Sequence, residues 1–257
     1  MSCCLQPRPH AALARLCDTT PEALAEAARA ARPYTPASWQ PLRRFIGDRQ
    51  TDTLDVDVCR DDPLDEITGP ARPGALNALP AYYQARYEHT LAKLLARRPV
   101  IELAREAAAA LPSPFGLCVL DAWRPLELQA HLAQDVAAVA DGFVAPPDPD
   151  PSRPPAHLTG ATLDITLSFP WKGRHVPLGL GTSFDAFCPC AHTTAPLDED
   201  VQTLRRLLTA NLASVGFVTY AREWWHVEHR TRRWAATTGR DACYGAAAPD
   251  VPGARQR

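Results

Sequence analysis

The sequence predicts an α+β fold, a single domain in which helices flank a central, mainly antiparallel sheet. Segments with a helical apolar period, such as 101–111, favour amphipathic helices. Segments 115–121 and 160–169 are instead a continuous and an alternating apolar run, which are typical of strands. The chain has 257 residues, 46% of them hydrophobic and 22% charged, and can therefore bury one sizeable core.

The first part of the chain predicts one helix followed by a long irregular segment. Thr20 and Pro21 form a helix start, and the alanine-rich segment EALAEAARAA continues the helix. Residues 33–77 carry many Pro, Gly and Asp residues, and within them the run LDVDV at 54–58 alternates like a strand. We therefore expect one strand inside this irregular segment.

The middle of the chain predicts helices around one buried strand. Apolar residues recur at helical spacing over 80–97, and a second helix over 101–111 follows Pro99. The compact apolar run at 115–121 is expected to be a core strand. Pro125 is well placed to open the next helix, LELQAHLAQDVAAVAD.

The last third predicts a loop, a strand, a long helix and a broken pair of strands. Residues 144–156 contain six prolines and are expected to form an extended loop. In 160–169, apolar residues alternate with polar ones, which places Asp164 on the polar face of a strand. The helix over 198–215 begins with acidic residues that suit its dipole, and 217–229 predicts two strand pieces.

Charge and composition argue for a small ligand. The formal net charge of -2, from 27 Lys+Arg and 29 Asp+Glu, gives no reason to expect nucleic acid or a membrane surface as a partner. Arg8, His10 and Arg15 interrupt the N-terminal segment where a secretory signal would be apolar, and no later stretch has the length of a membrane span. We expect a cytoplasmic protein.

The cysteine pattern favours thiols over a disulfide framework. The eight cysteines are scattered along a long chain, so most are expected to be reduced. The run CPCAH, with Cys188, Cys190 and His192, has soft-metal ligands, but only three of them and no matching fourth. A second metal site there is the less favoured interpretation.

Two short segments carry the residue types of a mononuclear zinc site. AHLTGATLDITL contains His157 and Asp164, and REWWHVEH contains Glu223 and His226. Two imidazoles and one carboxylate leave zinc an open fourth position, and a further carboxylate beside it suits amide hydrolysis. Residues three apart in a strand face opposite sides, so we expect Glu223 on a bend and His226 on a strand. From spacing alone, hydrogen-bonded core histidines and a turn-capping Asp remain equally open.

The contexts LDITL and EWWHVEH, with DAWRP upstream, resemble the D-alanyl-D-alanine dipeptidases of the VanX type. This group lies within the zinc peptidases that also include D,D-carboxypeptidases and share a core with the Hedgehog signalling domain. The similar stretch runs from Tyr82 to His226. The resemblance implies a zinc cleft on the α+β fold, with one Zn2+ per chain.

The resemblance also implies roles for individual residues. His157, Asp164 and His226 would be the zinc ligands. Glu223 would be the general base, which takes a proton from the attacking water and passes it to the leaving amine. Arg124 matches the arginine of the DxxRP segment, whose guanidinium stabilises the developing oxyanion.

Two further carboxylates are expected at the substrate. Asp121 would orient Arg124, with a purely structural ion pair as the alternative. Asp185, in PLGLGTSFD, matches the position that receives the free amino group of a dipeptide. A buried carboxylate there favours a free dipeptide, because a longer chain would leave its charge unpaired.

The sequence also departs from the family pattern. Pro155, Ala156 and Thr159 stand where the family has Ser before the first histidine and Arg after it. Of the N-terminal YxTxxNFxG element only Thr68 and Gly69 remain. Specificity for D-Ala-D-Ala depends on family contacts that this chain lacks, whereas the residues of dipeptidase chemistry are present.

The resemblance favours zinc-dependent hydrolysis of D-Ala-D-Ala or a related D,D-dipeptide. The alternatives are a D,D-carboxypeptidase or L,D-type cell-wall peptidase of the same fold, and a noncatalytic zinc-binding domain of the Hedgehog kind. Antibiotic resistance, peptidoglycan recycling and nutrition would use the same chemistry, and oligomeric state is left open. We expect an N-terminal extension over 1–50, the peptidase domain over 51–245 and a flexible tail over 246–257.

Overall fold

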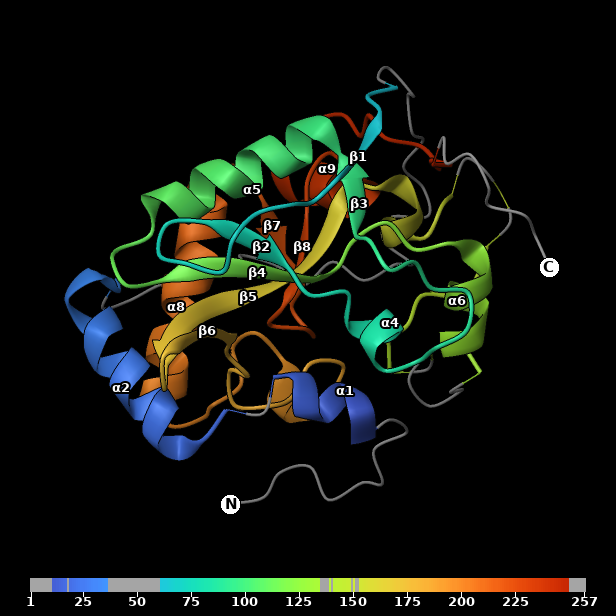
Figure 1. Ribbon diagram of the computed structural model, residues 1–257. Coiled ribbons are helices and arrows are strands. Elements are labelled where there is room, and N and C mark those ends of the chain that lie inside the picture. Colours follow the sequence, from blue (N-terminus) through green and yellow to red (C-terminus); the bar gives the residue numbers. More distant parts are fainter. Residues whose placement is uncertain are drawn as a thin grey trace.

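The computed structural model describes residues 11–249 except 18, 37–60, 135–138, 140, 149 and 151–152. It confirms a mixed α+β fold with a central sheet flanked by helices (Figure 1). The order of the sheet is β2-β4-β5-β8-β7, and β6 pairs with β5. Among these described strands, β2 and β4 are parallel and the other pairs are antiparallel. The strands are β2 (Leu76–Ala78), β4 (Gly116–Asp121), β5 (Thr162–Trp171), β6 (Arg174–Pro177), β7 (Val218–Thr219) and β8 (His226–Glu228).

The centre of the sheet is β4 and β5, which are its longest described strands. Every residue of β4 is buried. In β5, Leu163, Ile165 and Leu167 are fully buried, and so are Thr162 and Thr166 on the opposite face. The polar face of this strand is therefore buried as well. Its polar side chains can line an enclosed site.

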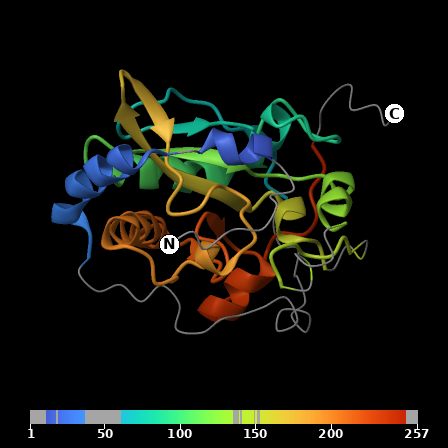
Figure 2. The same cartoon turned by 90° about the horizontal axis from the view of Figure 1, so that it is seen from below.

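Helices cover the sheet and share one core with it. The side chain of Asp198 accepts a hydrogen bond from the Val201 amide and so caps α8, as the acidic start predicts. α2 packs along α8, and α5 contacts both α8 and β4. Figure 2 shows the orange α8 and the red α9 on the same side of the sheet. The helices are α1 (Ala11–Leu16), α2 (Pro21–Ala31), α4 (Ala81–Gln84), α5 (Arg98–Ala110), α6 (Leu126–Leu132), α8 (Glu199–Ser214) and α9 (Arg232–Thr238), with short 3-10 turns η1 (Arg32–Tyr34), η2 (Ala156–Thr159) and η3 (Pro189–Ala191).

The prediction of a helix over 80–97 is correct for its first turn only and wrong beyond it. α4 ends at Gln84, and the chain then reaches β3 (Leu95–Arg97), which pairs with β1 (Leu64–Glu66). Arg86 and His89 have φ values of 63° and 58°, which a right-handed helix does not allow. Of the apolar residues with helical spacing, Tyr87, Leu94 and Leu95 are buried without a helix, whereas Tyr83 is exposed.

Two other predicted elements lie partly or wholly outside the described residues. α6 ends at Leu132, earlier than the sequence predicts, and 135–138 of the expected helix lie outside the described residues. The strand predicted at 54–58 also lies outside them. The hairpin partner β6 has no counterpart in the sequence prediction. It follows a turn at Lys172 and Gly173, whose φ values are 47° and 80°.

The start of the predicted tail is anchored to the domain. The amide of Ala247 donates to Leu158 O at 2.8 Å, and Trp123 Nε1 donates to Ala247 O at 2.8 Å. Residues 250–257 lie outside the described part, and the domain boundaries stay predictions. Among the described helices none has the length and apolar character needed to cross a bilayer.

Candidate active site

Three polar residues lie in one row across the central sheet. In the ladder between β4 and β5, Asp121 is opposite Asp164, just after an irregularity in register that follows Val119. In the ladder between β5 and β8, Asp164 is opposite His226. Residues directly opposite one another project from the same face, so the three side chains meet at the middle of the sheet.

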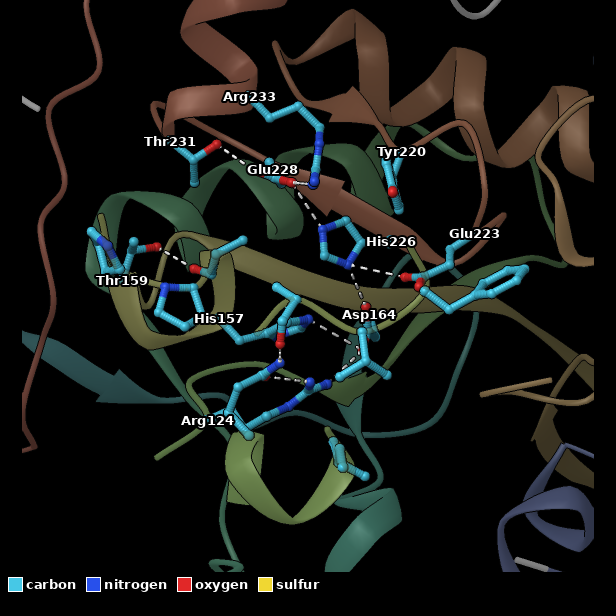
Figure 3. Close-up of a pocket in the computed structure, with 18 of the residues that line it drawn as sticks. Arg124, His157, Thr159, Asp164, Tyr220, Glu223, His226, Glu228, Thr231 and Arg233 are labelled. Atoms are coloured by element: carbon cyan, nitrogen blue, oxygen red, sulfur yellow. Dashed lines mark hydrogen bonds and ion pairs between the residues drawn. The ribbon is translucent and has the colours of Figure 1, made fainter. Parts of the chain in front are cut away.

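His157 approaches this row from η2. Its Nδ1 lies 2.7 Å from the carbonyl oxygen of Ala122, so Nδ1 carries the proton of the neutral ring and donates it there. Its Nε2 lies 3.5 Å from Asp164 Oδ2. The free lone pair of His157 therefore points toward Asp164 (Figure 3).

His226 is the first residue of β8 and faces Asp164 with its other nitrogen. Its Nδ1 lies 3.2 Å from Asp164 Oδ1, and its Nε2 lies 3.0 Å from Glu228 Oε1. Burial alone would lower the pKa of His226, but hydrogen bonds to Asp164 and Glu228 and the charge of Glu223 raise it to about 10. Without a metal the ring thus binds a proton strongly.

The three side chains fit a zinc ion. One ligand atom from each of His157, Asp164 and His226 lies within 4.8 Å of the other two, and all three residues are buried. Both carboxylate oxygens of Asp164 face an imidazole, since Oδ1 lies 3.2 Å from Nδ1 of His226 and Oδ2 lies 3.5 Å from Nε2 of His157. Burial would raise the pKa of Asp164, but the two histidines hold it well below its usual range, so it is a carboxylate. Two imidazoles, one carboxylate and room for a fourth ligand suit catalytic zinc.

Glu223 lies in the turn between β7 and β8, as its predicted position on a bend requires. Its Oε2 is 3.4 Å from His226 Nδ1. Thr193 holds the turn, since its hydroxyl lies within hydrogen-bonding distance of the carbonyls of both Tyr220 and Glu223. Burial raises the pKa of Glu223 to about 8, although His226 lowers it in part. A carboxylate of this kind takes up a proton readily.

Arg124 follows the end of β4 and is fixed from three sides. Its Nε donates to Asp121 Oδ2 at 2.9 Å, and its Nη1 donates to Gln129 Oε1 at 2.9 Å. Its Nη2 donates to the Tyr82 hydroxyl at 3.4 Å and lies 3.6 Å from Asp164 Oδ2. Burial would lower the pKa of Arg124, but the surrounding acidic groups raise it above its ordinary value, so the guanidinium stays charged.

Asp185 lies in the same cleft, in the loop after β6. It has a φ of 61°, an uncommon value for a residue other than glycine. The Tyr82 hydroxyl donates a hydrogen bond to it, so Tyr82 links Asp185 to Arg124. Burial raises the pKa of Asp185 to about 7, against the opposing effect of Arg124. Of the predicted site residues, Arg124, His157, Asp164, Asp185, Glu223 and His226 therefore line one cleft, whereas Asp121 does not line it and instead accepts a hydrogen bond from Arg124.

The cleft has a volume of about 840 Å3. Pro155, Ala156 and Thr159, which stand in place of the family's polar contacts, line it next to His157. Several lining residues were not predicted. Glu228 could have been found, because it follows His226 by two residues in a strand and must share its face. Tyr82, Gln129, Tyr220, Thr231 and Arg233 carry no comparable signal in the sequence.

The expectation of free thiols is wrong for part of the CPCAH run. Cys188 and Cys190 are disulfide-bonded, whereas Cys17, Cys118 and Cys243 are free. An oxidised sulfur is not a thiolate ligand. Within the described part of the chain, the only cluster with metal-ligand geometry is His157, Asp164 and His226.

Comparison with known proteins agrees with the geometry. A sequence profile of the family described as D-ala-D-ala dipeptidase matches residues 81–238. A D-alanyl-D-alanine dipeptidase of Synechocystis sp. is 27% identical in an alignment of 188 residues that covers 60% of this chain and 75% of the relative. A D-alanyl-D-alanine dipeptidase of Escherichia coli (strain K12) is 32% identical over 170 residues, which are 64% of this chain and 73% of the relative.

Proposed function

The chain belongs to the D-ala-D-ala dipeptidase family of peptidases, and we propose that it hydrolyses the peptide bond of D-alanyl-D-alanine or a related D,D-dipeptide with one zinc ion per chain. One observation carries the proposal. His157, Asp164 and His226 converge on one point, and Glu223 and Arg124 lie beside that point in the same cleft. A structural zinc site would need neither of the last two residues.

The metal would be held by Nε2 of His157, a carboxylate oxygen of Asp164 and Nδ1 of His226. These are the atoms that face one another across the site. Zinc bound there supplies a Lewis acid that activates water and polarises a carbonyl.

Glu223 is the general base of the proposed reaction. It accepts a proton from the water that attacks the peptide carbonyl, and then gives that proton to the leaving amine. Its burial supports this role, because the raised pKa of Glu223 makes its carboxylate a stronger base than an exposed one.

Arg124 and Asp185 contact two different parts of the substrate. The guanidinium of Arg124 stabilises the oxyanion that develops at the carbonyl, and its fixed hydrogen bonds mean that it needs no reorganisation. Asp185 receives the ammonium group of the free dipeptide, and Tyr82 keeps its carboxylate directed into the cleft.

The test is turnover of D-Ala-D-Ala, N-acetyl-D-Ala-D-Ala and L-Ala-L-Ala by the full chain with one equivalent of zinc. We expect hydrolysis of the free D,D-dipeptide alone, and its loss in Glu223→Ala with zinc retained. Glu199→Gln is the matched control, since Glu199 is an exposed carboxylate on α8 that pairs with Arg206.

The other outcomes discriminate the alternatives. A preference for the N-acetylated substrate would assign the chain to the D,D-carboxypeptidases, because such a substrate has no ammonium group for Asp185. Zinc binding without turnover of any substrate would indicate a noncatalytic zinc domain. Either result would contradict the dipeptidase proposal.

A further inference from the structure

Glu228 lies directly behind His226, on the side away from Asp164. The two residues are two apart in β8, so their side chains project from the same face of the strand. Oε1 of Glu228 is 3.0 Å from Nε2 of His226. Glu228 is only 1% exposed, so water does not replace this contact.

Two residues of the next element hold the Glu228 carboxylate in place. The hydroxyl of Thr231 donates to Oε2 and Nη1 of Arg233 donates to Oε1. Thr231 also caps α9, and the guanidinium of Arg233 lies 4.0 Å from the centre of the Tyr220 ring. The carboxylate is therefore oriented by groups that are themselves fixed, as Figure 3 shows.

This arrangement matters because a neutral imidazole has one protonated nitrogen and one lone pair. Nδ1 of His226 faces Asp164 and the metal position, so it can act as a ligand only when the proton is on Nε2. A carboxylate accepts a hydrogen bond from the protonated Nε2. This makes the lone pair on Nδ1 a stronger ligand for a metal. In His157 the roles of the two nitrogens are exchanged. Its Nδ1 carries the proton and donates to the carbonyl of Ala122, so Nε2 has the free lone pair.

We propose that Glu228 is a positioning residue, which holds His226 in the Nε2-protonated tautomer so that Nδ1 binds the metal, with Thr231 and Arg233 fixing the carboxylate. The inference rests on the zinc site of the proposed function. The competing explanation is that Glu228 and Arg233 form a buried ion pair that only joins α9 to the sheet. A structural pair would change thermal stability but not the affinity of the folded protein for zinc.

The test measures zinc affinity of the metal-free full chain by competition with a chelating dye. We expect Glu228→Ala to raise the zinc Kd by about 10- to 100-fold, the range typical of groups that hold metal-binding histidines. Glu228→Gln should have a smaller effect, because the amide oxygen still accepts from Nε2 but lacks the charge. Glu199→Gln is the control and should bind zinc like the wild type. An unchanged Kd in both Glu228 variants would overturn the proposal.

A second measurement does not depend on a foldable variant. Long-range proton–nitrogen NMR spectra of the zinc-loaded wild type should show His226 protonated at Nε2 and metal-bound at Nδ1, and His157 with the reverse assignment. Metal binding by Nε2 of His226 would refute the inference even if Glu228→Ala does not fold.

The proposed function can fail independently of this inference. If the variants lose zinc affinity but the wild type hydrolyses no dipeptide, only the dipeptidase proposal is wrong. If the wild type is an active dipeptidase and its variants bind zinc normally, only the role of Glu228 is wrong. A wild type that binds no zinc would refute both.

Discussion

Asp121 and Asp164 face each other across the ladder between β4 and β5, so two buried carboxylates lie side by side. Such a pair is unfavourable unless a cation balances it. Arg124 does so, with Nη2 2.8 Å from Asp121 Oδ2 and 3.6 Å from Asp164 Oδ2. The same guanidinium thus balances the charge of the site and lines the cleft in which we propose that the substrate binds.

Arg124→Lys should lower kcat for D-Ala-D-Ala by about 10²- to 10³-fold, as expected for loss of an oxyanion donor. Lysine keeps the charge but lacks the planar fork that reaches both Asp121 and Gln129. Zinc content, measured by atomic absorption, should stay near one per chain. Arg98→Lys, an exposed arginine paired with Asp65, is the control, and equal kcat values in the two variants would refute the role of Arg124.

Asp185→Asn should raise KM for the free dipeptide, and the N-acetylated dipeptide should remain unhydrolysed by both proteins. The pKa of Asp185 is about 7, so in the wild type its carboxylate becomes protonated as pH falls below that value. KM for the free dipeptide should therefore rise between pH 7 and pH 5 in the wild type, and the Asn variant should lack this rise. Initial rates over this pH range provide the measurement, and a parallel pH dependence in both proteins would contradict it.

Glu223→Gln should stabilise the metal-free protein at high pH. The folded-state pKa of Glu223 is about 8, above its ordinary 4.5, so the folded chain retains a proton that the unfolded chain releases. The stabilising contribution of this group is complete below pH 4.5 and is lost as pH rises to 8. We expect the variant to melt roughly 5 °C higher than the wild type at pH 9. Its melting temperature should match the wild type at pH 4.5, and a uniform shift at both pH values would argue against a titrating Glu223.

Zinc should stabilise the folded chain by about 4 kcal/mol when free zinc is 1,000 times its Kd. The reason is that the ligands come from η2, β5 and β8 and meet only in the folded state. Calorimetric melting with and without a chelator measures the gain. Asp164→Asn should lose most of it, and an equal gain in this variant would place the ion elsewhere.

Gly160→Ala should destabilise the protein more than Gly173→Ala. Both glycines have positive φ, 69° and 80°, so each substitution costs about 1–2 kcal/mol from the backbone alone. A Cβ at Gly160 would also collide with the side chain of Leu64, whereas nothing lies within 4 Å at Gly173. Since Gly160 ends η2, its variant should also bind zinc more weakly. Urea unfolding and zinc titration of both variants give the comparison.

Elements with a strong local signal could be predicted from the sequence. Thr20 and Asp198 are N-caps whose hydroxyl and carboxylate accept amide hydrogen bonds, and both helices begin where these residues predict. The continuous apolar run of β4 marked the central strand. The bend at Glu223 followed from geometry, because a straight strand cannot direct it and His226 to one point.

Features that depend on distant parts of the chain could not be predicted. The pairing of Asp121 with Asp164 depends on an irregularity in the β4 ladder, which no residue type marks. The loop after α4 shares the apolar spacing of a helix, and the left-handed residues Arg86 and His89 that end the helix carry no sequence signal. Arg233 reaches Glu228 only because α9 folds back behind β8.

Asp121, Asp164 and His226 come from three different strands and lie in one row. An ion can therefore bind there only when these strands pair in the observed register. A slip of β8 by one residue would present Val227 instead of His226 and would turn the imidazole to the opposite face. The energy of metal coordination then favours one pairing of the strands over its neighbours. Zinc present during refolding should select correctly paired chains, in addition to its proposed part in hydrolysis.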